Sequence, residues 1–540
     1  MPPMMPLLRH AVIAAPLILL GAAMPWLVGE TNFSSRWMIR IAGPCLIVSA
    51  LLCWIWRNPP DVIAVAERIR TASSRISLWG WAVVAVAAVW LIGGAWLDGF
   101  PIIGDVYAVL MQAKTFALGQ LTVPAPPVPE AFSQHRFVVA HGVWISQYPP
   151  GWALLLTPLA WLGLPFWLAP TVFGAGILIL FWRIARRRLD PTLAAFAVLT
   201  LAGSAFFVLN ASTLFPHAPA AFFGLAAVEA VLRKREGGGW VCASIAGAML
   251  GVMGLIRPFN AVIFIAVLGG VLLLDWARSR EWRDVSALAA FALGGLPFAL
   301  GLMGYHYLIT GSPFTMIPTW LGGYEPLGTF GSRTIFLTLY RFGNLGLTSS
   351  PVLALAGTLA PILLLLRRRL EFTDLLFPAT VIAFLFYGGT GGPPLSYGPR
   401  YYFEAFPLLV LSFAVGISVL DPQRRALKAV LAVHLIVQIA ALASWLVFER
   451  LATRGLSEPF RLAEAANLEN ALVIMETCPS SYRRCVLKDM TYNGLEVTTP
   501  PVVYALDLGD GGARLKAAFP DRDLWIYRDG ALTPIASGNP

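Results

Sequence analysis

The sequence predicts a polytopic α-helical membrane protein. Of its 540 residues, 57% are hydrophobic and only 13% are charged, whereas a soluble domain carries about 25% charged residues. Several apolar runs approach the ~20 residues that an α-helix needs to cross a bilayer. In hydrocarbon every backbone polar group must be hydrogen-bonded within the protein, so runs of this length can cross only as helices.

Basic clusters beside these runs predict which side each helix end faces. The net charge of +10 is gathered in short loops, which is the positive-inside pattern of cytoplasmic loops and not that of a nucleic-acid-binding surface. The clusters are Arg57/Arg68/Arg70/Arg75, Arg183/Arg186/Arg187/Arg188, Arg233/Lys234/Arg235, Arg278/Arg280/Arg283, Arg367/Arg368/Arg369 and Arg424/Arg425/Lys428.

About thirteen spans place every cluster on one side, with the N-terminus inside and the C-terminus outside. The first run lacks a small-residue cleavage site followed by a soluble domain, so we expect a retained anchor. The expected spans lie near 11–28, 39–56, 76–97, 165–182, 191–209, 214–232, 240–256, 259–275, 285–309, 348–366, 373–390, 405–421 and 428–447.

This topology divides the chain into three parts. Residues 1–75 hold two spans and a cytoplasmic loop, and residues 76–450 form the main membrane core. Residues 451–540 form a small external domain, which shares its side with a long loop at 98–150 and a second loop at 310–346.

One apolar segment does not fit the count of spans. Residues 151–164, "WALLLTPLAWLGLP", are short and interrupted by Pro158, with Pro165 next in the chain. Counting them as a span would place Arg186–Arg188 outside, so we expect a re-entrant or interfacial segment.

The composition changes from about Leu451, where charge returns and apolar runs shorten. Residues 471–475, 500–509 and 523–527 read as strands, and 458–469 and 510–519 read as short helices, the second with Asp510 as N-cap. We expect a small α/β domain. It has no metal spacing, phosphate loop or nucleophile motif, so a lid that packs or positions an acceptor is favoured over a catalytic role.

The five cysteines predict little chemistry. Cys45, Cys53 and Cys242 fall in spans and are expected to be packing residues. Cys478 and Cys485 lie in the external domain, where an oxidising compartment would permit a disulfide. Their spacing is compatible with a bridge and does not establish one.

Five polar residues share the external face in this topology: Asp105, Tyr148, His217, Arg257 and Arg400. Charges near a bilayer are expensive and therefore mark candidate functional sites. Each has a simpler alternative. An arginine at a span end can extend to the headgroups, Asp105 can be a helix N-cap, and a lone histidine can be a packing residue. A carboxylate and two arginines on one face favour a shared site.

This set suits glycosyl transfer from a sugar linked to a lipid phosphate. A carboxylate can take the proton of an acceptor hydroxyl as it attacks the anomeric carbon. Guanidinium groups match the phosphate leaving group, and we expect Arg257 and Arg400 in that role, with His217 and Arg341 next in line. Residues expected to line the substrate pocket are Tyr107, Trp144, Tyr148, His217, Tyr401 and Tyr402.

Several motifs of this chain resemble those of a known superfamily, in their order along the chain and in the side of the membrane that they face. The acid in "GDVY", the long external loop ending in "YPPGW", the "RP" turn at Arg257 and the segment "YGPRYYFEAFP" together resemble the GT-C superfamily of integral-membrane glycosyltransferases. The likeness is to bacterial members related to the aminoarabinose:lipid A transferases and, more distantly, to the protein O-mannosyltransferases. It covers roughly residues 76–447.

The resemblance implies an inverting enzyme of the bacterial inner membrane that works on the periplasmic side. Its donor would be a polyprenyl-phosphate sugar, its acceptor a lipid or glycan, and its catalytic base Asp105. Many members have a second acid directly after this aspartate, and here that position is Val106. We therefore expect no obligatory metal or other cofactor, although a divalent metal remains possible, and Asp98 is the reserve acid.

Two other functions stay open at this stage. A flippase or transporter of lipid-linked glycans would need polar residues deep within spans, and His434 is the exception to nearly charge-free span interiors. An O-antigen-type polymerase or ligase would depend on arginines of external loops more than on an early acid. Loss of Asp105 would stop a transferase and leave a flippase active.

Overall fold

The structure of the chain is a computed structural model. Predicted spans 11–28 and 39–56, most of 76–97, and the cysteines Cys45, Cys53 and Cys485 lie outside the residues that it describes, so the proposed disulfide is not tested. The described residues are Gly80, Val83, Ala87, 91–101, 103–132, 136–321, 332–386, 398–420, 425–478, 486–487 and 491–535.

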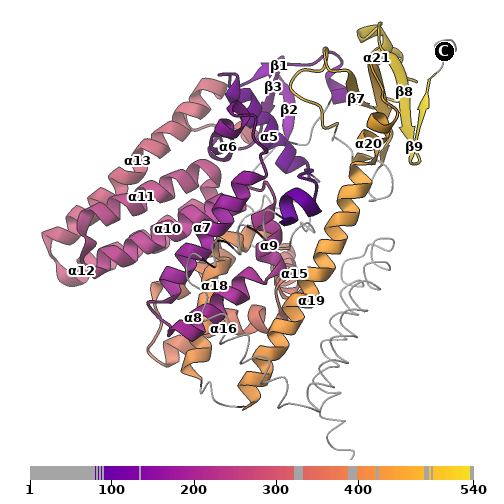
Figure 1. Ribbon diagram of the computed structural model, residues 1–540. Helices are drawn as coiled ribbons and strands as arrows, with labels where there is room; N and C mark the ends of the chain where they lie inside the picture. The colour runs from indigo at the N-terminus through magenta and orange to yellow at the C-terminus, as the bar shows by residue number, and fades with distance from the viewer. Residues whose placement is uncertain are drawn as a thin grey trace, which may run out of the picture.

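A helix or a helix pair lies in every predicted span from 165–182 onward, within the residues that the structure describes (Figure 1). They are α7 (Leu168–Ala185), α8 (Pro191–Ala202), α9 (Ala205–Ser212), α10 (His217–Arg233), α11 (Gly239–Ile256), α12 (Pro258–Ser279), α13 (Trp282–Thr310), α16 (Pro351–Leu366), α17 (Leu376–Leu385), α18 (Phe406–Val419) and α19 (Arg425–Leu456). A short π-helix, η1 (Leu91–Trp96), lies in the predicted span 76–97.

Length and composition allow five of the described helices to cross a membrane, or six if the bent pair α8 and α9 is one span. One of the five is the stretch His217–Ile256, which comprises α10, η3 and α11. The chain reverses direction at η3 (Lys234–Gly238), where Gly237 has φ +110°, so α10 packs against α11 (Figure 1). The chain is a polytopic helical membrane protein, and the predicted number of thirteen spans is not established.

The second half of the predicted loop at 310–346 is helical, and its position relative to the membrane stays a prediction. The structure has a short helix, α14 (Ile317–Trp320), and then a full helix, α15 (Ser332–Thr348). Helix α15 carries polar side chains on the face that packs inward, among them Arg341, Asn344 and Thr348, all at most 8% exposed. The sequence did not indicate this helix as an apolar run, because it carries these polar residues on its buried face.

The long loop at 98–150 is built of small elements. Helix α5 (Gly104–Ala117) is followed by β1 (Val123–Pro124), η2 (Pro129–Phe132), β2 (Phe137–Ala140) and β3 (Val143–Ser146). The strands form an antiparallel sheet in the order β1-β3-β2. His141 and Gly142 join β2 to β3 with φ +51° and +77°, the left-handed conformations that a tight two-residue hairpin turn requires.

The predicted non-spanning segment 151–164 is helix α6 (Gly151–Trp161). Its 11 residues rise only about 16 Å, roughly half of the hydrocarbon thickness. The structure thus agrees that this segment does not cross as a straight helix, and its position relative to the bilayer stays a prediction.

The predicted strands and helices of the C-terminal region are confirmed. They are α20 (Glu458–Ala465), β4 (Ala471–Met475), β7 (Val502–Leu506), α21 (Ala513–Ala518) and β8 (Asp523–Arg528). An additional strand, β9 (Ala531–Pro534), completes a sheet in the order β7-β4-β8-β9, and β5 (Thr477–Cys478) pairs with β6 (Val486–Leu487). The prediction that Asp510 is the N-cap of the second helix is wrong, because the N-cap of α21 is Gly512; Asp510 precedes it in the turn and accepts the backbone N–H groups of Gly512 and Arg514.

The C-terminal region packs on the loop at 98–150. Helix α19 runs along the bundle and leads to the small sheet, which lies beside β1–β3 (Figure 1). Phe132 of η2 meets Phe519 with ring centroids 5.8 Å apart, and Arg514 forms an ion pair with Glu130 at 3.0 Å. The two regions predicted to share a side are therefore in direct contact.

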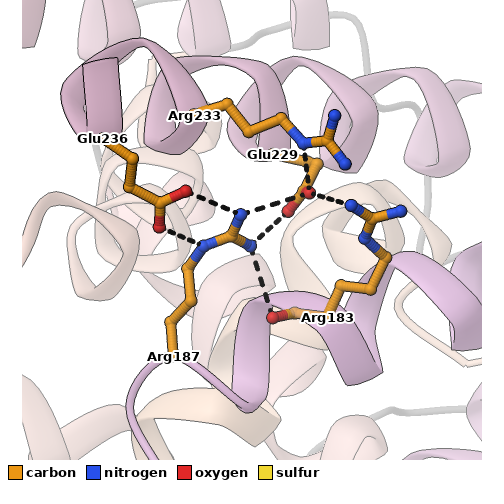
Figure 2. A network of polar contacts seen from close by, with 5 residues as sticks. All are labelled: Arg183, Arg187, Glu229, Arg233 and Glu236. Atoms are coloured by element: carbon orange, nitrogen blue, oxygen red, sulfur yellow. Dashed lines mark hydrogen bonds and ion pairs between the residues drawn. The ribbon is translucent and has the colours of Figure 1, made fainter. Parts of the chain in front are cut away.

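Several residues of the basic clusters are bound to carboxylates at one end of the bundle. The Glu229 carboxylate receives Arg183 at 3.1 Å, Arg187 at 2.5 Å and Arg233 at 2.9 Å (Figure 2). Arg187 also pairs with Glu236 at 2.6 Å. These contacts join the last residues of α7 and α10, so two clusters that are distant in sequence form one network.

Other clusters join the same end. Lys234 pairs with Asp284 at 2.6 Å, and Arg188 pairs with Asp374 at 2.8 Å and donates to the Arg369 backbone oxygen at 3.0 Å. Helix α10 begins at His217 and ends at Arg233. His217 therefore lies at the opposite end from the basic network, as the sequence predicted.

Candidate active site

Asp105 and Arg400 form an ion pair although 295 residues separate them in the sequence. Arg400 Nη2 donates to Asp105 Oδ2 at 2.7 Å, and the two side chains are 13% and 12% exposed. Helix α5 begins at Gly104 after Ile103 and has no side-chain cap. The alternative that Asp105 is the N-cap is thus wrong, and its carboxylate is held by an arginine instead.

The backbone before Arg400 fixes its position. Arg400 is the first residue of a 3-10 helix, η5 (Arg400–Ala405), which continues into α18. Gly398 has φ +76°, and a Cβ there would lie 2.8 Å from Thr348 Oγ1 and 3.0 Å from the Phe206 ring. Only glycine fits this close left-handed turn, so the backbone holds Arg400 in a fixed place.

Tyr148 lies beside the ion pair, on the segment between β3 and α6. Burial raises the pKa of Tyr148 well above its usual value, and Asp105 raises it further through its charge and a hydrogen bond from the hydroxyl. The Gln112 amide donates to the Tyr148 backbone oxygen and to the Tyr305 hydroxyl, each at 3.0 Å. Tyr148 is therefore a neutral hydrogen-bond donor at the carboxylate.

A second carboxylate, Glu404, is fully buried at the centre of a polar cluster. Its Oε1 receives Arg257 Nε at 2.8 Å and His217 Nδ1 at 3.0 Å, and its Oε2 receives Asn260 Nδ2 at 3.0 Å. Arg257 lies between α11 and α12 with φ −142° and ψ 83°. This extended conformation follows from Pro258, because a residue before proline is excluded from the helical region.

The two ion pairs meet at the ring of Tyr401. The guanidinium carbons of Arg257, Arg341 and Arg400 lie 5.6, 5.7 and 5.8 Å from the centroid of this ring. Arg400 also lies 4.7 Å from the centroid of Phe215. Three guanidinium groups around one aromatic ring make this end of the bundle a cationic centre suited to a phosphate.

A cavity of about 300 Å³ opens near Tyr148. Tyr305, which holds Gln112 and through it the Tyr148 backbone, is part of the wall. The other lining residues are mainly apolar and include Phe116, Leu121, Leu154 and Leu255. A hydrocarbon segment would fit this environment better than a sugar would.

The structure brings together most of the predicted site residues. Asp105, Tyr148, His217, Arg257, Arg400 and Tyr401 lie in one connected group. Tyr107 and Trp144 do not join it. Tyr107 packs edge-on against Tyr492 of the C-terminal region with centroids 5.3 Å apart, and Trp144 is fully buried and donates to the Phe137 backbone oxygen at 3.0 Å. Their contacts are those of packing residues and do not support a pocket role.

The reserve acid Asp98 also lies apart from the group. It pairs with Arg450 of α19 at 2.7 Å and is 52% exposed. Its contact fastens α19 to the segment after η1, so the structure favours Asp105 over Asp98 as the acid of the site.

Sequence reasoning missed Glu404 and Asn260. Glu404 stands in the quoted segment "YGPRYYFEAFP" at the start of an apolar run, and an acid in such a place is a functional candidate. Asn260 follows "RPF" in a helix and has no distinguishing pattern.

Among the described residues no group of three or more His, Cys, Asp or Glu side chains could hold a metal ion. The two carboxylates of the site each pair with an arginine. Whether a metal is needed stays a prediction.

Comparisons with known proteins connect this geometry to a fold. Residues 155–301 match the family described as dolichyl-phosphate-mannose-protein mannosyltransferase. This segment contains His217 and Arg257 and ends before Arg400. No curated protein sequence matches the chain.

Two solved structures resemble most of the chain. ArnT from Cupriavidus metallidurans bound to undecaprenyl phosphate has a TM-score of 0.52 at 14% sequence identity, covering 85% of this chain and 99% of that chain. The same protein in the apo state has a TM-score of 0.50 at 15% identity, covering 76% and 85%. The family match and the shared architecture confirm the resemblance predicted from the sequence motifs: this chain has the fold of the GT-C glycosyltransferases.

Proposed function

We propose that the chain transfers a sugar from a polyprenyl-phosphate donor to a lipid or glycan acceptor. The observation that carries this proposal is the Asp105–Arg400 ion pair, which lies among three arginines around Tyr401. In this proposal Asp105 is the base for the acceptor, and the neighbouring guanidinium groups bind the leaving phosphate. The similar fold of ArnT, described in complex with undecaprenyl phosphate, supports a lipid-phosphate donor.

Asp105 acts as the general base. Its pairing with Arg400 favours the ionised carboxylate, which is the form that accepts a proton. The acceptor hydroxyl gives its proton to Asp105 as its oxygen bonds to the anomeric carbon. The bond from that carbon to the phosphate oxygen breaks, and its electron pair leaves with the phosphate, so the configuration inverts.

Arg257 and Arg400 stabilise the departing phosphate. The ion pairs with Glu404 and Asp105 use Nε of Arg257 and Nη2 of Arg400, so each guanidinium has further N–H donors that a phosphate can engage. Glu404 and Asn260 hold Arg257 in place. The apolar cavity beside Tyr305 receives a hydrocarbon segment of one of the two lipids.

Mass analysis of envelope lipids and glycans tests this proposal. Cells that lack the protein are expected to lose one sugar increment from one component, and re-expression of the wild-type chain restores it. An Asp105→Asn chain should not restore it. An unchanged envelope in the deletion strain, or full rescue by Asp105→Asn, would contradict transfer by this site.

We expect Arg257→Ala and Arg400→Ala each to weaken donor binding and slow turnover. A charge-assisted hydrogen bond contributes about 1.5–3 kcal/mol, so each loss should be about 10- to 100-fold in affinity. Lysine at either position should restore donor binding and turnover only in part, because an ammonium lacks the planar paired N–H donors of a guanidinium. The test measures donor affinity and single-turnover rate of both variants. If both variants behave like wild type, these arginines do not bind the phosphate.

The orientation can be tested separately. We propose that the site and the C-terminal region face the periplasm, because the basic clusters gather at the opposite end of the bundle. A reporter enzyme that is active only in the cytoplasm should be inactive when fused after Pro540. The same reporter inserted beside Arg280, in the basic end, should be active, and the reverse pattern would invert the topology.

A further inference from the structure

We infer that Arg341 is a ligand of the phosphate group of the lipid carrier. It supplies a positive charge that no described carboxylate of the site neutralises, whereas Arg257 and Arg400 are each paired with one. This inference rests on the proposed function and adds to it the residue that sets the charge of the phosphate site.

Arg341 is a buried cation without a counter-charge in the part of the chain that the structure describes. It lies on α15 and is 2% exposed. Its Nε and Nη2 atoms make no hydrogen bond, and none of the ion pairs between described residues includes it. The Tyr402 hydroxyl interacts with it, but this neutral group also lacks a hydrogen bond of good geometry.

Aromatic rings surround the Arg341 guanidinium. Its carbon lies 5.7 Å from the centroid of Tyr401 and 6.0 Å from those of Tyr402 and Phe384. Cation–π contacts of this kind stabilise a guanidinium in part and leave its N–H donors unsatisfied. A buried charge that keeps unused donors indicates an anion that arrives from outside the chain.

The position of Arg341 connects it to the proposed reaction. Tyr401 is shared with Arg257 and Arg400, so the three guanidinium groups surround one ring. Glu404 balances Arg257 and Asp105 balances Arg400, which leaves the charge of Arg341 unmatched among these groups. A phosphodiester carries one negative charge, so the sugar–phosphate–lipid donor matches this excess.

A cation–π anchor is the competing role for Arg341, and the two roles differ in what a methionine would do. Methionine keeps the length and the apolar contacts and removes the charge. If Arg341 is a ligand without an internal partner, Arg341→Met should leave the melting temperature of the ligand-free protein equal or higher, because an unpaired buried charge disfavours the folded state. If it is an anchor, that temperature should fall.

The experiment measures thermal unfolding of the purified full-length protein with and without undecaprenyl phosphate. Ligand that binds the folded state raises the melting temperature according to its affinity. We expect Arg341→Met to weaken undecaprenyl phosphate binding about 10- to 100-fold, and Arg341→Lys to weaken it less. Inorganic phosphate at the same concentration should give no Arg341-dependent shift, because it lacks the lipid.

Arg188→Met is the matched control. Arg188 is also buried, with a side chain 7% exposed, but it pairs with Asp374 at the basic end. Its loss should lower the melting temperature and leave the undecaprenyl phosphate shift intact. The inference is overturned if Arg341→Met keeps the wild-type shift, or if inorganic phosphate alone reproduces the Arg341-dependent shift. Absence of any shift in the wild-type protein would instead contradict the proposed function itself.

Discussion

Asp105→Asn is expected to slow sugar transfer by the purified protein about 10²- to 10⁴-fold, the contribution of a general base. Asparagine keeps the shape of the side chain, and its carbonyl can still accept a hydrogen bond from Arg400. It cannot take a proton from the acceptor hydroxyl. Single-turnover rates at saturating donor measure the loss, and donor binding should change much less than the rate.

Asp98→Asn is the control for this substitution. Asp98 is an acid of the same loop, but it pairs with Arg450 in an exposed position, so its loss should leave the rate near that of wild type. If Asp105→Asn turns over normally, Asp105 is not the base. If the transfer rate of Asp98→Asn falls instead, Asp98 is the base, and its ion pair with Arg450 does not persist in the active protein.

Glu404→Ala is expected to have the largest effect on stability. Glu404 is fully buried and accepts from Arg257, His217 and Asn260. Removal of one partner of a buried ion pair destabilises by about 3–5 kcal/mol, because the remaining charge is left uncompensated. Glu404→Gln keeps a hydrogen-bonding side chain and loses only the charge, so its loss of stability should be smaller.

Thermal unfolding of the purified variants measures this difference, and Glu229→Ala provides the comparison. Glu229 also receives three arginines, but Arg183 and Arg233 are 41% and 48% exposed, so water can solvate them after the substitution. The decrease in melting temperature should therefore be clearly smaller for Glu229→Ala than for Glu404→Ala. Equal decreases would mean that burial of the Glu404 cluster does not determine its contribution.

Glu404 should also influence the donor site through Arg257. Glu404→Gln is expected to weaken undecaprenyl phosphate binding less than Arg257→Ala does, because the arginine remains but is held less firmly. A small loss of affinity in Glu404→Gln would show that Glu404 positions Arg257 for the donor. A purely structural role of Glu404 would instead lower stability and leave the donor affinity unchanged.

Local patterns in the sequence were sufficient for most elements of the fold. Apolar runs bounded by basic clusters predicted the helices α7–α13 and α16–α19, since hydrocarbon leaves helices as the available structure for such runs. Short apolar runs predicted β4, β7 and β8. The Arg257–Pro258 pair predicted a turn, because proline restricts the residue before it. Each of these inferences needs only residues that are neighbours in the chain.

Helix α15 is an element that local composition did not predict. Its polar residues would be unfavourable in lipid, so composition favoured a loop. In the structure they are buried against other helices, and the backbone of α15 itself satisfies two of them: Asn344 donates to the Tyr340 backbone oxygen at 3.1 Å and the Thr348 hydroxyl to that of Asn344 at 2.7 Å. The surroundings of a helix, and not its composition alone, determine which polar side chains it can carry.

The sequence by itself determined that Asp105, His217, Arg257 and Arg400 lie at the same end of a helical bundle, opposite the basic clusters. Only the tertiary structure decided their partners: Arg400 for Asp105, Glu404 for Arg257 and His217, and the C-terminal region for Tyr107. The physical reason is that sidedness follows from where each helix begins and ends, which is local. Pairing of side chains 295 positions apart follows from how α5, α10, α12 and η5 pack together, and no local pattern specifies that packing.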